Sequence, residues 1–228
     1  MSERLVWRLA AASGILYVAL GFARGGGGGG VGLGDSRETI ATWVSGTLGP
    51  RGVGWTGAYL ELLALLSFVV FVGVLAAALR RGEGTQPWLS NVTLGAGLIT
   101  VTVKLASLPA AFALAYRAHD GFDQQLAAAL TDMNNFSFVL TWPTTSLMIA
   151  AAAICILRFK VLPIWLGWSG VVAAVALLAA VPLAFGQGAF VAFVASTLWV
   201  LLASATMIVR PAPEAPALAT RAALPAIG

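Results

Sequence analysis

Lys104 and Glu61 are the two residues of this chain whose type and position could do chemistry. Lys104 lies in the run Val92 to Tyr116 and Glu61 in the run Trp55 to Leu79, and each run is otherwise free of charge. An ionisable group inside a membrane is costly unless it is paired or hydrated. The sequence therefore predicts that Glu61 and Lys104 form an ion pair inside a membrane bundle.

Sequence motifs that would support catalysis or metal binding are absent. The chain has one cysteine, Cys155, and one histidine, His119, too few for a cysteine-rich or histidine-rich metal site. No GxSxG or HExxH motif occurs, and a lysine with a glutamate is not by itself a mechanism. We expect no catalytic residues, no cofactor and no metal, and an intramembrane enzyme ranks behind the other interpretations.

Small and polar residues recur at helical spacing beside the expected ion pair. One stripe holds Asn134, Ser137, Thr141, Thr144 and Met148, and the face of Lys104 holds Gly97, Thr100, Ser107 and Ala111. From these we predict a cavity in the outer half of the bundle, bounded by the first four spans, in which Tyr59, Asn134 and Thr141 join Glu61 and Lys104 as ligand contacts. The competing interpretation is that such hydroxyls bond their own backbone and pack helices together.

Composition places the elements that carry these residues in a membrane. Hydrophobic residues make up 59% and charged residues 10% of the 228 residues, against about 25% charged in soluble domains. Six apolar runs approach or exceed the length needed to cross a bilayer, which predicts an all-α polytopic bundle over residues 1–210. The predicted spans are 5–23, 55–79, 92–116, 136–157, 163–185 and 189–209.

Basic residues set the expected orientation. With a cytoplasmic N-terminus, eight basic residues fall inside and four outside, so both termini are predicted to be cytoplasmic. The inside set is Arg4, Arg8, Arg80, Arg81, Arg158, Lys160, Arg210 and Arg221, and the outside set is Arg24, Arg37, Arg51 and Arg117. The basic residues that flank the spans thus set the orientation of the protein in the membrane, and no nucleic-acid partner is expected. The first span also resembles a secretory signal peptide, but Tyr17 and Phe22 make a poor cleavage region, so we expect it to be retained.

Two of the segments outside the predicted spans carry predictions of their own. The external connection 24–54 opens with the flexible run Gly25 to Gly30 and continues into Ile40 to Leu48, whose apolar residues recur at helical spacing. We expect this amphipathic segment either to lie on the outer membrane surface or to fold over the bundle as a lid. The proline-rich tail 211–228 is predicted to be disordered in the cytoplasm.

Several short motifs carry a resemblance to a known family. They are Trp55 to Glu61, Leu79-Arg80-Arg81, Val103 to Ala106, Asp132-Met133-Asn134 and Leu162 to Trp168. Together they resemble a family of uncharacterised multi-pass membrane proteins common in actinobacteria. The resemblance covers more than half of the chain and implies a six-helix topology without an assigned activity.

Two functions remain open for a protein of the bacterial cytoplasmic membrane. In the first, the bundle binds or passes a small solute, ion or lipid through the outward-facing polar cavity. In the second, it is a non-catalytic membrane subunit or sensor, in which the Glu61–Lys104 pair fixes helix register and the amphipathic segment or the cytoplasmic hairpins meet a partner membrane protein. The two differ in whether Glu61 and Lys104 are hydrated.

Overall fold

The computed structural model describes residues 2–23, 31–32, 34–48, 53–118, 123–183 and 188–210, and this part of the chain contains helices but no strand. The prediction of an all-α fold is confirmed. The elements are α1 (Glu3–Ala23), α2 (Arg37–Trp43), the π-helix η1 (Val44–Leu48), α3 (Val53–Glu83), α4 (Trp88–Arg117), α5 (Gln124–Phe159), α6 (Ile164–Ala180), the 3₁₀ turn η2 (Val181–Leu183) and α7 (Gly188–Val209).

Six of these helices are long and apolar enough to span a membrane: α1, α3, α4, α5, α6 with η2, and α7. The predicted number of spans is therefore confirmed. Several helices extend past the apolar runs, and α5 begins at Gln124, twelve residues before the expected Phe136. Hydropathy marks where the apolar residues lie, whereas a helix continues as long as its backbone amides can bond within it.

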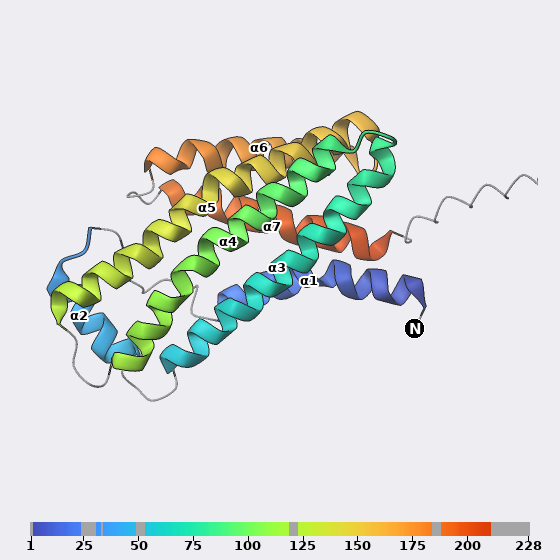
Figure 1. Ribbon diagram of the computed structural model, residues 1–228. Helices are drawn as coiled ribbons and strands as arrows, with labels where there is room; N and C mark the ends of the chain where they lie inside the picture. The colour runs from blue at the N-terminus through green and yellow to red at the C-terminus, as the bar shows by residue number, and fades with distance from the viewer. Residues whose placement is uncertain are drawn as a thin grey trace, which may run out of the picture.

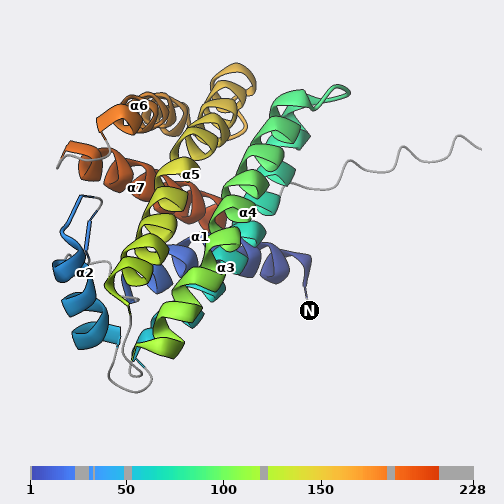
Figure 2. The same cartoon turned by 60° about the vertical axis from the view of Figure 1, so that its left-hand side comes forward.

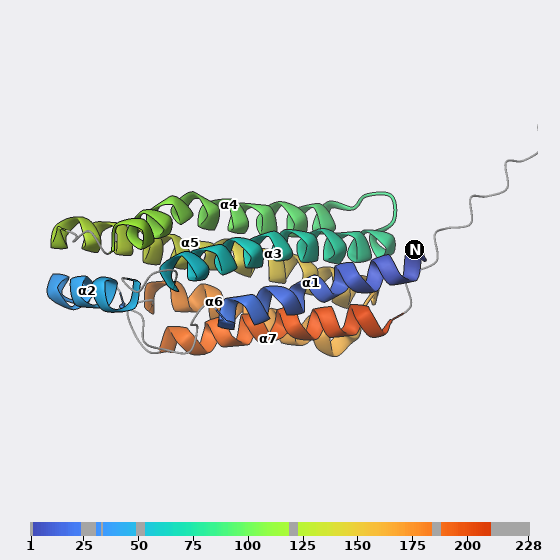
Figure 3. The ribbon, with the colours of Figure 1, turned by 90° about the horizontal axis from the view of Figure 1, so that it is seen from below.

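The six long helices form a closed ring. Each packs against its neighbours in the order α1, α3, α4, α5, α6 and α7, and α7 returns to contact α1. Figure 1 shows the long helices spanning the length of the bundle between its two ends, with α2 at the end opposite the N-terminus. Figure 2 shows α5 between α4 and α6, and Figure 3 shows α1 beside both α3 and α7.

Helix α2 and η1 pack onto the bundle. Ser36 caps α2 by accepting a hydrogen bond from Thr39 N at 3.1 Å. Ile40 and Val44 are buried against four residues of α4, α5 and their connection, Leu114, Ala118, Ala127 and Ala128. Of the two positions expected for this segment, the structure favours the one folded over the bundle.

Two buried glycines allow neighbouring helices to approach closely. A Cβ atom at Gly97 of α4 would lie 2.5 Å from Val72 Cγ1 of α3, and one at Gly14 of α1 would overlap Ser204 Oγ of α7. Small residues in these positions suit membrane helices, whose association depends on close van der Waals packing. Pro109 and Pro143 lie within α4 and α5, and both helices continue through them.

Some sequence predictions concern residues outside the described ranges. These are the run Gly25 to Gly30, His119, the tail 211–228 with Arg221, and Arg24 and Arg51 of the expected outside set. Their predicted roles remain predictions.

Candidate functional site

Lys104 and Glu61 form the predicted ion pair. Lys104 Nζ lies 3.2 Å from Glu61 Oε1, and only about a twentieth of either residue is exposed. Nζ also donates to Asn134 Oδ1 at 2.8 Å, with Asn134 O at 3.3 Å and Ser137 Oγ at 3.4 Å. The pair joins α3 to α4, and the hydrogen bonds add α5.

The polar contacts between α4 and α5 follow from matching residue spacings. Lys104 and Ser107 lie one turn apart on α4, and Asn134 and Ser137 lie one turn apart on α5. Where the two helices face each other, Ser137 Oγ lies 2.7 Å from Ser107 Oγ. Ser107 Oγ donates in turn to Lys104 O at 2.9 Å. The buried polar groups of both helices therefore meet in one network.

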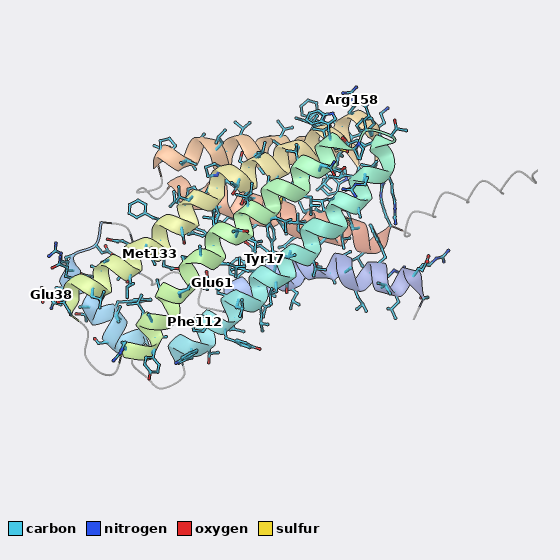
Figure 4. All side chains as sticks on the ribbon, in the orientation of Figure 1. Tyr17, Glu38, Glu61, Phe112, Met133 and Arg158 are labelled. Atoms are coloured by element: carbon cyan, nitrogen blue, oxygen red, sulfur yellow. The ribbon has the colours of Figure 1, made fainter. Side chains whose placement is uncertain are left out.

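A cavity of about 650 Å³ lies beside this network. All six long helices contribute to its wall, as does Trp43 of α2. Its polar lining includes Glu61, Lys104, Asn134, Asn135, Thr141 and Thr197, and its aromatic lining includes Tyr17, Phe68, Phe138, Trp142 and Phe193. Figure 4 shows Tyr17 and Glu61 inside the bundle, whereas Glu38 and Arg158 lie at its opposite ends.

The cavity occupies the half of the bundle that carries α2. On α3 its lining runs from Gly54 to Phe68, on α4 from Thr100 to Leu114, and on α5 from Thr131 to Thr145. Each stretch covers about 20 Å at the helical rise of about 1.5 Å per residue. The cavity is thus elongated along the helix axes, with its lining on three helices beginning and ending at similar depths.

Trp43 of α2 and Val31 belong to the wall at the α2 end of the bundle. The side-chain amide of Asn135 on α5 donates to Val31 O at 3.1 Å. These contacts place Val31 and α2 over this end of the cavity, where the hydrogen bond to Val31 and the apolar contacts of Ile40 and Val44 hold them.

Four of the five residues predicted to contact a ligand lie together in the cavity wall: Glu61, Lys104, Asn134 and Thr141. Tyr59 does not line the cavity and is 54% exposed. Two residues along a helix correspond to a rotation of about 200°, so Tyr59 and Glu61 point to opposite sides of α3. Tyr17 of α1 lies in the wall instead, with its ring 4.6 Å from that of Phe68.

Sequence reasoning missed the part of the wall that α6 and α7 supply. Leu177 of α6 and the α7 residues Phe193, Ser196 and Thr197 line the cavity. The two neighbouring hydroxyls of Ser196 and Thr197 in an apolar span were a usable signal. Only the return of α7 to α1 brings them to the cavity formed by the earlier helices.

The remaining polar groups do not suggest a metal centre. Within the described ranges, no three His, Cys, Asp or Glu side chains gather closely enough to hold a metal ion. Cys155 is buried and its thiol lies 3.9 Å from Leu79 O. It packs against α3 at a distance from the cavity wall.

Fold and site together define a class: a six-helix bundle of membrane-spanning character with a central cavity and a buried ion pair. No protein-family model, curated protein or solved structure was found to match the chain. Functional inference therefore rests on the geometry of the cavity.

Proposed function

We propose that this chain is an integral protein of the bacterial cytoplasmic membrane that binds or passes a small molecule through the central cavity. The observation that carries the proposal is the cavity itself, about 650 Å³ in volume, with the Glu61–Lys104 pair in its wall. Cavities of this size, mostly apolar with a few converging polar groups, are typical of small-molecule sites. We also propose that the chain belongs to the actinobacterial family of six-helix membrane proteins that it resembles.

The charges of the described helices support a cytoplasmic N-terminus and an outward-facing cavity. Seven basic residues lie near the end of the bundle that carries the N-terminus: Arg4, Arg8, Arg80, Arg81, Arg158, Lys160 and Arg210. Near the α2 end the described basic residues are Arg37 and Arg117. Basic residues are retained on the cytoplasmic side, so the cavity would open away from the cytoplasm.

Cysteine accessibility tests the proposal. Single cysteines replace Ala111 and Thr197, which line the cavity without taking part in the ion pair, in a Cys155→Ala background. Intact cells are treated with a small, membrane-impermeant thiol reagent. We expect both positions to be labelled. Ala152→Cys is the matched control, because Ala152 is fully buried and does not line the cavity, and it should stay unlabelled.

A second function is favoured by the complete coordination of Lys104. Its ammonium has Glu61, Asn134 and Ser137 within 3.4 Å, the arrangement expected of a structural pair that fixes helix register. In that case the chain would be a non-catalytic membrane subunit or sensor with a partner membrane protein.

The labelling pattern separates the two functions and also tests the orientation. Labelling from outside supports the outward cavity. Labelling only in inverted vesicles keeps the cavity and reverses the orientation. Absence of labelling on both sides, in protein shown to be folded and inserted, would favour the structural pair.

A further inference from the structure

We infer that the cavity accepts an uncharged, elongated lipid-like molecule that carries a hydroxyl group. This inference rests on the proposed function and specifies its ligand class. It draws on three independent properties of the cavity: its shape, the balance of its charges and the hydrogen-bonding groups of its wall.

The shape suits a chain-like molecule. The lining extends for about 20 Å along three helices, close to two thirds of the hydrocarbon thickness of a bilayer. Apolar and aromatic side chains make up most of the wall, among them Leu65, Phe68, Phe138 and Phe193. A long hydrocarbon chain would exchange lipid contacts for these side chains at little cost, whereas a strongly polar solute would lose its hydration.

The charges disfavour an ionic ligand. Among the described residues of the wall, Glu61 and Lys104 are the charged ones, and they contact each other at 3.2 Å. Asn134 and Ser137 occupy the remaining directions around the Lys104 ammonium. A ligand charge would therefore be buried without a counterion of its own, which is strongly unfavourable in an apolar site.

Neutral hydrogen-bonding groups complete the wall. The hydroxyls of Thr141, Ser196 and Thr197 donate to carbonyl groups of their own helices at 2.6 to 3.0 Å, so each retains lone pairs that can accept a hydrogen bond. The indole N–H of Trp142 and the hydroxyl of Thr131 are buried and have no hydrogen-bond partner among the described residues. A hydroxyl group can donate to the first set and accept from the second.

Photocrosslinking in nanodiscs of phosphatidylcholine tests the inference. The probes are hexadecanol, hexadecyl sulfate, hexadecyltrimethylammonium and hexadecane, each with a diazirine at mid-chain. We expect hexadecanol to crosslink saturably to peptides of the cavity wall. Hexadecane should bind about fivefold more weakly, the value of about one neutral hydrogen bond. Both charged probes should bind at least roughly tenfold more weakly.

Two variants separate charge from hydrogen bonding. Glu61→Gln leaves Lys104 without its counter-charge and should shift the preference toward hexadecyl sulfate. Trp142→Phe removes the indole N–H and should shrink the advantage of hexadecanol over hexadecane. Its matched control is Trp168→Phe, because Trp168 is exposed and lies outside the cavity wall.

The outcomes distinguish this inference from the proposed function. A charged probe that crosslinks in the wall of the wild-type protein as strongly as hexadecanol would overturn the inference, even if Glu61→Gln fails to fold. Crosslinks confined to other surfaces would also overturn it, while labelling of Ala111→Cys would preserve the proposed cavity. If neither crosslinks nor thiol labelling is found, the ligand inference and the proposed cavity function are both contradicted.

Discussion

Inside the apolar bundle, protein atoms replace the water around the ammonium group of Lys104. Glu61 supplies the opposite charge, and Asn134 and Ser137 supply neutral oxygen atoms. Attraction between buried charges repays the loss of hydration only when such further hydrogen bonds are made. Replacing one member of the pair should therefore destabilise the protein, whereas replacing both members should affect its stability much less.

Replacing Lys104 alone tests this dependence. Lys104→Met should lower the free energy of unfolding by about 3 kcal/mol or more, because Glu61 is left buried without its counter-charge. The double variant Glu61→Met with Lys104→Met should recover most of that loss. Reversible unfolding in mixed micelles, analysed as a double-mutant cycle, measures both. A single-variant loss below about 1 kcal/mol would show instead that water hydrates the remaining charge, as it does at a surface.

At the scale of elements, α4 is the helix on which the site depends. It supplies Lys104 and the face that meets α5, and Gly97 lets it approach α3. The Glu83 carboxylate holds the start of α4 by accepting from Leu89 N at 2.7 Å and Ser90 N at 2.9 Å. Register between α3 and α4 is thus fixed at the turn and again at the ion pair.

Two glycines of α4 form a matched pair for testing this packing. A Cβ at Gly97 would lie 2.5 Å from a methyl of the stiff Val72 side chain, whereas one at Gly95 would meet nothing within 4 Å. Gly97→Ala should therefore destabilise the protein by about 1–3 kcal/mol through overpacking. Gly95→Ala should be neutral or stabilising by up to about 1 kcal/mol. Equal effects in thermal unfolding would contradict the close crossing of α3 and α4 at Gly97.

At the scale of the whole molecule, contact between the first and last helices closes the ring. Trp7 Nε1 of α1 donates to Met207 O of α7 at 3.1 Å, and the guanidinium of Arg81 on α3 lies 5.0 Å above the Trp7 ring. Farther along α1, Gly14 packs against Ser204. Helix α1 is thus part of the ring, and it also contributes Tyr17 to the cavity wall.

Ring closure can be tested at Gly14. Gly14→Ala would place a methyl carbon in overlap with Ser204 Oγ and 2.6 Å from the Phe71 ring, so it should lower the melting temperature. Ser204→Ala removes one of these obstacles together with a buried hydroxyl that has no hydrogen-bond partner among the described residues. It should be nearly neutral alone and partly rescue Gly14→Ala. Strictly additive effects would argue against direct contact of α1 with α7 at this point.

The sequence by itself determined the class of protein, the number of spans and the identity of the ion pair. Apolar runs and isolated charges are local properties, and the cost of placing a charge in lipid applies whatever the surrounding fold is. Because of that cost, the charged residues of two apolar runs, Glu61 and Lys104, could be paired from the sequence alone. The sequence also indicated the amphipathic segment, although it left open whether that segment lies on the membrane or on the bundle.

Only the tertiary structure decided which helix faces meet. In the structure, Tyr59 points away from the cavity, whereas Ser196 and Thr197 of α7 lie in its wall. Ile40 and Val44 pack onto the bundle. Trp7 and Met207, whose side-chain to backbone hydrogen bond helps close the ring, are 200 residues apart. Helical periodicity shows which residues share a face, but the partner of that face is set by packing among all six helices at once.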